Sequence, residues 1–254
     1  MYFNNLQITA LMSQTGTRHK NFFNRIDENI FLGKPTIILI DGKSQTGKST
    51  FARWLCMQYD KKYLTVFQIE KILTYFLGLA IPYYNNEMDK IYNRWLLIEE
   101  PQLEVPRQEF WSTRNLILQG VTSSYGFTRN NVVMTLPNIK GISEMIYTNI
   151  TFRISIDSKL DKDKNIVRKA YNKKPVWIER RNKYRWVLVE RFTIPKIELP
   201  DEKEYKLLKA DNFFKTQLPK WIDKLSIDKP KIKVELDKQT GNLISSIGSA
   251  YLTQ

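Results

Sequence analysis

The most constraining feature of this sequence is an apolar run that leads directly into a short segment containing two glycines. The run, Thr36 to Asp41, reads Thr-Ile-Ile-Leu-Ile-Asp, which is typical of a strand buried on both faces of a parallel sheet. The next residues, Gly42 to Ser49, match the pattern G-x-x-x-x-G-K-[ST] in full. Ser49 to Asp60 then reads as a helix. The sequence therefore predicts a strand, a tight loop and a helix in direct succession.

Between a strand and a helix, this pattern cradles phosphate groups. The glycines let backbone N–H groups point inward at the phosphates, Lys48 neutralises the β- and γ-phosphate charges, and the Ser49 hydroxyl reaches Mg²⁺. A chance match in a turn is the alternative, and the flanking strand and helix argue against it. The implied cofactors are ATP and Mg²⁺. The residues predicted to bind them are Gly42, Lys43, Ser44, Gln45, Thr46, Gly47, Lys48, Ser49 and Thr50.

A second apolar run ends in two carboxylates. Arg94 to Glu99 reads as a strand, and Glu100 follows it. In a sheet built around such a loop this strand end lies beside the phosphates, so we assign Glu99 to Mg²⁺ and Glu100 to orienting the attacking water. The alternative is a solvated turn, which Pro101 would favour. The doubled carboxylate favours ATP hydrolysis over phosphoryl transfer to another acceptor.

Three further side chains are candidates for the catalytic site. Thr135, near the end of the predicted strand Asn131 to Leu136, is placed to hydrogen-bond the attacking water or to sense the γ-phosphate. Arg114 and Arg129 lie between the predicted third and fourth strands, and either is a candidate arginine finger on a neighbouring subunit. The alternative for each arginine is a solvated or phosphate-contacting residue. His19 is the only histidine, so multi-histidine metal sites are excluded.

Strands alternate with helices from residue 35 onward, which predicts an α/β fold with a mostly parallel sheet. Five strands are expected up to Ile156, and three short ones after it form an antiparallel extension. The remaining predicted strands are Tyr63–Ile69, Asn149–Ile156, Asn165–Tyr171, Val176–Arg180 and Tyr184–Thr193, and the remaining predicted helices are Glu70–Leu79, Arg107–Gln119 and a C-terminal one within Asp201–Gln217.

We divide the chain into four parts. Residues 1–34 form a weakly structured lead-in, in which Phe22, Phe23, Ile26 and Ile30 mark the apolar stripe of a short helix. Residues 35–157 form the ATPase core and 158–195 a basic β-rich extension. Residues 196–254 contain the C-terminal helix and a tail, which we expect to be mostly irregular.

Positive charge concentrates in the extension. The chain has a formal net charge of +14, which makes a polyanionic partner the default expectation. Residues 151–195 hold 13 Lys or Arg against five acidic residues, and aromatic residues are interleaved with them. Cations and aromatics together suit phosphate contact and base stacking, although the aromatics could instead form the extension's own core. The predicted nucleic-acid contacts are Lys173, Lys174, Arg180, Arg181 and Lys183.

Taken together, the loop at 42–49, Glu99–Glu100 and Thr135 resemble the additional-strand, catalytic-glutamate (ASCE) branch of P-loop NTPases, which includes AAA+ (DnaA-like) proteins and FtsK/HerA-type motors. The segment 99–156 is similar to ATPases encoded by archaeal viruses and plasmids. Those proteins commonly read Asp-Glu-Ala-Gly where this chain reads Glu-Glu-Pro-Gln at 99–102. The resemblance, over roughly residues 35–215, implies a core sheet of order 5-1-4-3-2 and assembly into a ring or filament around DNA.

We therefore expect an ATP-hydrolysing enzyme that acts, as an oligomer, on the DNA of a viral or plasmid element in replication, unwinding or genome packaging. One alternative is a small-molecule or nucleoside kinase, for which Glu70 is the candidate carboxylate at the end of the second strand. Another is a slow nucleotide-dependent DNA-binding scaffold. The sequence has no apolar run of about 18 residues that would span a membrane, and the single cysteine, Cys56, fits a cytoplasmic location in the host cell.

Overall fold

The computed structural model describes residues 22–87, 90, 92–101, 128–139, 146, 149–179, 183–224, 232–236 and 243–247. For residues 69, 70, 73, 76, 77, 79, 80, 83, 183, 224, 232–236 and 243–247 it describes the backbone alone. The chain divides at Pro200 into two compact units, Met1–Pro200 and Asp201–Gln254. The first unit contains the glycine-containing loop and the basic extension.

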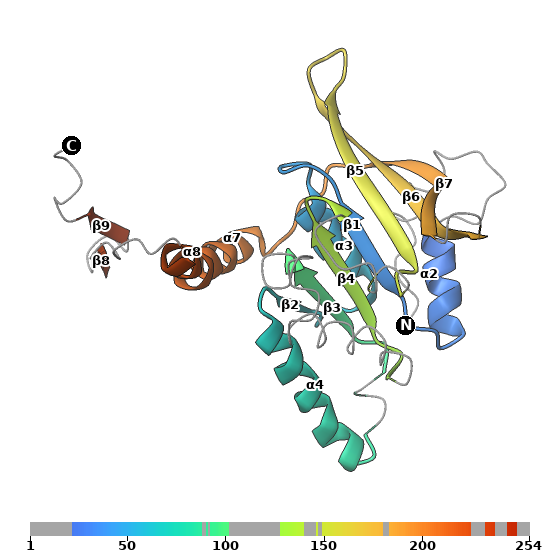
Figure 1. Cartoon of the computed structure of the whole chain (residues 1–254), viewed down its shortest axis with the longest axis horizontal. Helices are drawn as coiled ribbons and strands as arrows, with labels where there is room; N and C mark the ends of the chain where they lie inside the picture. The colour runs from blue at the N-terminus through green and yellow to red at the C-terminus, as the bar shows by residue number, and fades with distance from the viewer. Residues whose placement is uncertain are drawn as a thin grey trace. The chain divides into compact units, whose positions relative to one another are not determined.

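The described part of the first unit is built on one seven-stranded sheet (Figure 1). In spatial order its strands are β2 (Leu64–Val66), β3 (Trp95–Glu99), β4 (Asn131–Leu136), β1 (Ile37–Asp41), β5 (Phe152–Leu160), β6 (Ile166–Ile178) and β7 (Lys183–Ile194). The first five of these are mutually parallel, and β6 and β7 continue the sheet antiparallel.

This strand order is the 5-1-4-3-2 order that the resemblance implies, so the predicted P-loop NTPase fold is confirmed. β4 is the additional strand between β1, which leads into the loop, and β3, which ends in the glutamates. Because the five strands are parallel, their carboxyl ends meet at one edge of the sheet, where ligands bind in open α/β folds. The predicted mostly parallel sheet with an antiparallel extension is therefore confirmed.

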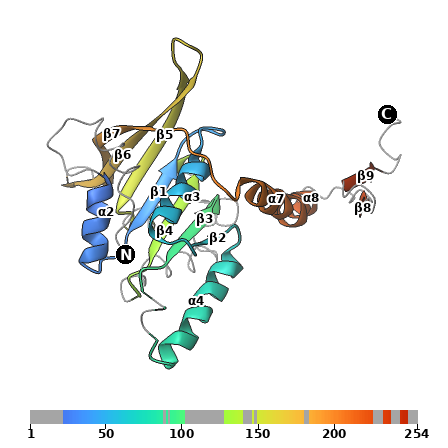
Figure 2. The ribbon, with the colours of Figure 1, turned by 180° about the vertical axis from the view of Figure 1, so that it is seen from behind.

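Helices pack on both faces of the sheet. α3 (Lys48–Tyr59) lies across one face, as Figure 2 shows from behind. α2 (Phe22–Phe31) contributes to the same core through Phe22, Phe23 and Ile26, which are buried. α4 (Ile69–Tyr84) packs Ile72 into the core on the opposite face. The short helix predicted from its apolar stripe is therefore confirmed as Phe22–Phe31, so this part of the lead-in is a helix packed on the core and not weakly structured.

The antiparallel extension differs from the sequence prediction in one respect. Where two short strands were expected, β6 is one continuous strand paired along β5 and β7. The turn-like residues Asn172 to Pro175 lie within this strand, at a β-bulge between Asn172 and Lys173. A bulge accommodates an irregular backbone without ending the pairing, which is why the turn signal was misleading. The β5–β6 hairpin extends beyond the rest of the sheet (Figure 1).

Two other expected elements have different bounds. β2 is shorter than predicted and ends at Val66, and α4 continues to Tyr84 with Pro82 inside it. Glu70 therefore lies in the first turn of α4, not at the end of β2 as the kinase alternative requires. The predicted helix Arg107–Gln119 lies outside the described residues.

Within its described residues, the second unit contains three helical segments, α7 (Glu202–Asn212), the π-helix η6 (Phe213–Gln217) and α8 (Leu218–Lys224). It also contains a two-stranded antiparallel sheet of β8 (Ile232–Leu236) and β9 (Leu243–Ile247). The predicted C-terminal helix is present and continues beyond Gln217, and the hairpin replaces part of the irregular tail that was expected.

Candidate functional site

The loop that follows β1 has the backbone of a tight phosphate-binding turn. Gly42, Gln45 and Gly47 all adopt positive φ, at 151°, 64° and 86°. Gly42 also packs against β5, since a Cβ at this position would lie 2.3 Å from the backbone oxygen of Ile156. The Thr46 hydroxyl closes the loop by donating to the Lys43 carbonyl at 3.0 Å. A side chain at Gly42 would therefore displace the loop from the sheet.

The loop leads into the N-terminus of α3, where Gly47 is the N-cap and Lys48 the first helical residue. The Lys48 ammonium donates to the Lys43 carbonyl at 2.6 Å, so it lies across the loop. Backbone N–H groups at a helix N-terminus and a lysine beside them form a site that favours an anion. The loop and α3 thus have the geometry that a nucleotide's phosphates require.

Three side chains from separate elements meet next to the loop. Glu99, the last residue of β3, is buried and accepts two hydrogen bonds through the same carboxylate oxygen, Oε2. One comes from the Ser49 hydroxyl at 2.9 Å and the other from the Thr135 hydroxyl at 2.7 Å. β3 and β4 are paired at this point, with Glu99 opposite Thr135. The strand order therefore brings together residues that are far apart in the sequence.

These residues fit a hard divalent cation. The other carboxylate oxygen of Glu99, Oε1, is buried and has no hydrogen-bond partner within the described part of the chain. A serine hydroxyl that donates its proton to a carboxylate keeps lone pairs for a metal ion. Mg²⁺ prefers oxygen ligands and retains several waters, so one hydroxyl and one nearby carboxylate suit it. Ser49 and Glu99 are the residues that would hold Mg²⁺.

Glu100 lies immediately beyond this set, at a sharp turn of the backbone. Its φ is +52°, a left-handed conformation that is uncommon for a residue other than glycine and that often marks functional sites. Its N–H donates to the Thr135 carbonyl at 3.1 Å, which fixes the turn against β4. The Glu100 side chain is half-buried. Because of this turn, the two adjacent glutamates have different surroundings.

Thr135 is buried, and its hydroxyl already donates to Glu99. The same oxygen also accepts a long hydrogen bond of 3.4 Å from the Glu100 N–H. The geometry therefore connects Thr135 to both glutamates. This arrangement suits a residue that positions the carboxylates, and contact with the attacking water or the γ-phosphate stays a prediction.

Arg129, one of the two arginines expected to act as a finger, is not part of this cluster. Arg129 precedes β4, at the opposite edge of the sheet, where its side chain packs against Gly33 and stacks over the ring of Tyr92 at 5.0 Å. β4 is six residues long, so Arg129 lies roughly 20 Å from the carboxyl edge. Arg114 lies outside the described residues.

A buried ion pair at the end of β1 was not expected from the sequence. Asp41 is buried, and the Arg153 guanidinium donates to its Oδ2 at 2.5 and 3.1 Å. The Ser155 hydroxyl donates to Oδ1 at 2.5 Å and in turn accepts from the Lys173 ammonium at 2.9 Å. Burial, followed by the nearby Arg153 charge, lowers the pKa of Lys173. This cluster fixes β5 and β6 to the strand that carries the loop.

The sheet face opposite α3 carries cations and aromatics along the extension. Arg153 lies over the ring of Trp186 at 5.4 Å, and Arg191 over the ring of Tyr171 at 5.9 Å. Trp177 and Tyr184 pair edge to face, and their side chains are 45% and 43% exposed. The residues that we call the aromatic face are Arg153, Lys169, Tyr171, Lys173, Trp177, Tyr184, Trp186 and Arg191.

The residues predicted to contact nucleic acid are not gathered on one face. Lys173 belongs to the aromatic face but also to the Asp41 cluster, and Lys174 is exposed on the other side of β6. Arg180 and Arg181 lie outside the described residues, and for Lys183 the backbone alone is described. Strand alternation explains the separation of Lys173 and Lys174, since neighbouring residues point to opposite faces.

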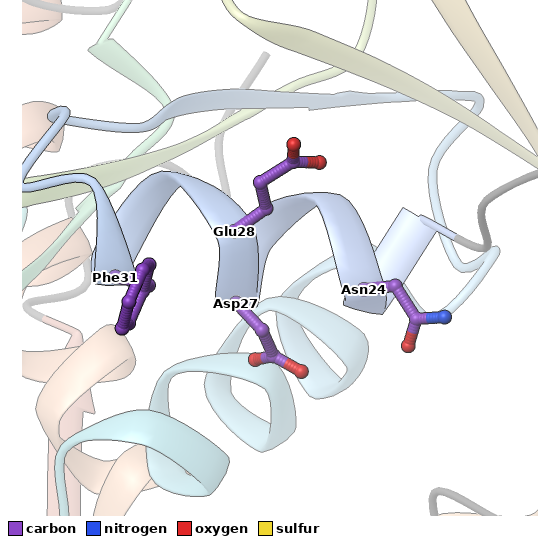
Figure 3. Close-up of a pocket in the computed structure, with 4 residues that line it drawn as sticks. All are labelled: Asn24, Asp27, Glu28 and Phe31. Carbon is purple, nitrogen blue, oxygen red and sulfur yellow. The ribbon is translucent and has the colours of Figure 1, made fainter.

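A shallow hollow on α2 lies away from the loop. Figure 3 shows the four side chains that line it, Asn24, Asp27, Glu28 and Phe31. Burial raises the pKa of Asp27, which interacts with Tyr59 at the last turn of α3. Because α3 spans 12 residues, this turn is about 16 Å from the loop. The hollow is therefore separate from the cluster around Glu99.

The described residues contain no group of three or more His, Cys, Asp or Glu side chains placed to hold a metal ion. No helix among them has both the length and the apolar character needed to cross a membrane.

No protein-family model and no curated protein matches the chain. Among solved structures, the N-terminal domain of zonular occludens toxin from Neisseria meningitidis is 11% identical, with a TM-score of 0.36, covering 61% of this chain and 94% of that one. The genome packaging NTPase B204 from Sulfolobus turreted icosahedral virus 2, in complex with ATP-gammaS, is 10% identical, with a TM-score of 0.31, covering 51% and 78%. EssC (ATPases 2 and 3) from Geobacillus thermodenitrificans is 13% identical, with a TM-score of 0.41, covering 84% and 54%. The fold assignment of this chain rests on its own strand order and loop.

Proposed function

We propose that the chain binds ATP with Mg²⁺ at the loop Gly42–Ser49 and hydrolyses it. The observation that carries this proposal is the hydrogen-bonded set of Ser49, Glu99 and Thr135. It connects the helix that begins at the loop to the carboxyl end of β3, as a metal-assisted phosphoryl-transfer site requires. A loop match alone would be compatible with phosphate binding of any kind.

Each residue then has a distinct role. The loop N–H groups and Lys48 bind the β- and γ-phosphates, and Ser49 and Glu99 hold the metal ion. Mg²⁺ supplies charge neutralisation on the phosphate oxygens. Glu100 orients the attacking water and accepts its proton, and Thr135 fixes the relative position of the two glutamates.

Two substitutions test these roles, with nucleotide binding and phosphate release measured on each variant. Lys48→Ala removes the cation in the cradle, so both binding and turnover should be lost. Glu100→Gln keeps the cradle and the shape of the side chain but removes the base, so ATP should bind normally and phosphate release should fall at least a hundredfold. Normal turnover in Lys48→Ala would refute the loop as the site, and normal turnover in Glu100→Gln would refute the role of that carboxylate.

We further propose that the polyanionic partner is DNA and that the aromatic face contacts it. Exposed Trp177 and Tyr184 offer ring surfaces on which bases can stack, while Lys169 and Arg191 supply positive charge for the backbone. The excess of eight positive charges within residues 151–195 supports a polyanionic partner. Lys174, Arg180, Arg181 and Lys183 remain predicted backbone contacts.

The DNA proposal is tested by fluorescence anisotropy with a labelled single-stranded oligonucleotide and a labelled duplex over a salt series. Trp177→Ala should weaken single-strand binding by about tenfold at every salt concentration, because base stacking is insensitive to salt. Lys169→Ala should instead reduce the salt dependence. Lys203→Ala, an exposed lysine of α7, is the matched control. Unchanged binding in both face variants would contradict the proposal.

We also propose that the chain self-associates. The enzyme would then act in replication, unwinding or packaging of a viral or plasmid genome. Arg129 and Arg114 stay predicted arginine fingers; from the edge opposite the loop, Arg129 would reach a phosphate site only on another copy of the chain. Sedimentation velocity with and without ATP tests self-association. A monomer under both conditions would contradict it.

A further inference from the structure

The β5–β6 hairpin forms one wall of the phosphate-binding loop, and Arg168 of β6 is the side chain that reaches it. A Cβ built on Gly47 would lie 2.7 Å from Nε of Arg168 and 3.0 Å from its Cδ. On the same wall, Gly42 packs against the backbone of Ile156. Arg168 therefore packs directly on the loop, in the same chain.

Arg168 approaches the loop with a hydrogen-bond donor that is unsatisfied among the described residues. Its Nε is fully buried and has no hydrogen-bond partner within the described part of the chain. The remainder of the side chain is half-buried. A guanidinium carries five N–H donors, and leaving a buried one unsatisfied is costly. A second cation beside Lys48 in a loop built for phosphates indicates that the missing partner is an anion.

The strand order indicates which end of the nucleotide Arg168 faces. Glu99 and Thr135 belong to β3 and β4, on one side of β1, whereas β5 and β6 lie on the other side. If the γ-phosphate points toward the glutamates that act on it, the rest of the nucleotide extends the opposite way. The α-phosphate end then lies on the side of β6.

We propose that Arg168 binds the α-phosphate end of the nucleotide in its own subunit. This inference rests on the proposed ATP site. A contact at that end is present with ATP and ADP alike and is the same before and after hydrolysis, so it contributes to affinity and not to the chemical step. This behaviour distinguishes Arg168 from an arginine finger, which acts on the γ-phosphate during transfer.

The test measures the affinities for ADP and for the non-hydrolysable analogue AMPPCP by titration calorimetry, and kcat at saturating ATP. Arg168→Gln should weaken both affinities by about tenfold while kcat stays within about twofold. Arg168→Lys should fall between this variant and the wild type. Arg185→Gln removes the same charge from an exposed residue of β7, which pairs with Val176, eight residues along β6 from Arg168, and should leave both affinities unchanged.

Three results would contradict the inference. Unchanged affinities in Arg168→Gln would show that the residue does not touch the nucleotide. A lower kcat with unchanged ADP affinity would assign it to the γ-phosphate. Equal weakening by Arg185→Gln would indicate a general effect of charge. If Lys48→Ala also binds like the wild type, the loop itself is not the site and the proposed function fails; if Lys48→Ala loses binding and Arg168→Gln does not, this inference alone fails.

Discussion

Replacing Thr135 with valine should weaken the coupling between Mg²⁺ binding and nucleotide binding. Valine keeps the branched shape of the buried side chain but removes the hydroxyl that donates to Glu99 Oε2 at 2.7 Å. A hydrogen bond to a charged acceptor contributes about 1.5–3 kcal/mol. The Ser49 donor to the same oxygen remains, so the loss should be at the lower end, near 1.5 kcal/mol, or about tenfold in metal affinity.

The assay compares the ADP affinity in excess Mg²⁺ with that in EDTA, and the ratio of the two measures the coupling. In Thr135→Val this ratio should fall about tenfold, with the affinity in EDTA unchanged. Thr135→Ser retains the donor and should keep most of the coupling. An unchanged ratio in Thr135→Val would refute the reasoning that Thr135 positions a metal-holding carboxylate.

Three further predictions concern the parts that support the site. Gly42→Ala should abolish nucleotide binding, as titration calorimetry would show, because the new Cβ meets the Ile156 carbonyl; retained binding would mean that the loop tolerates the displacement. Arg153→Met should lower the free energy of unfolding in urea by about 3 kcal/mol, because it leaves the Asp41 carboxylate buried without its cation, and a loss below about 1 kcal/mol would show that Asp41 is hydrated. The Cys56 thiol, whose pKa is raised well above its ordinary value mainly by burial, should react with a disulfide reagent at pH 8 only after unfolding; rapid labelling of the native protein would contradict the packing of α3.

The loop half of the candidate site could be predicted from sequence because its signals are local. The apolar run, the glycines and Lys48 are consecutive, so their chemistry and their placement follow from the same short segment. Glu99 was predictable because a buried strand of a parallel sheet presents its carboxyl end at a known edge. The same logic placed Thr135 near the loop, although not its hydrogen bond to Glu99.

The remaining contacts depend on pairing between distant strands, which no local pattern encodes. Arg168 reaches Gly47 because β6 pairs with β5 in one particular register, and a shift of one residue would turn it away. The Asp41–Arg153 pair likewise depends on the register of β1 with β5. The position of these cations in a basic stretch of the sequence did not indicate which face of the sheet each would occupy.

Phosphate release from ATP, measured without DNA, with single-stranded DNA and with duplex DNA over a salt series, tests the central claim most directly. The account predicts that DNA stimulates hydrolysis and that this stimulation is lost as the salt concentration rises. It also predicts that hydrolysis disappears in Glu100→Gln. Hydrolysis that persists in Glu100→Gln, or that DNA leaves unchanged at low salt, would contradict a DNA-acting ATPase built on this site.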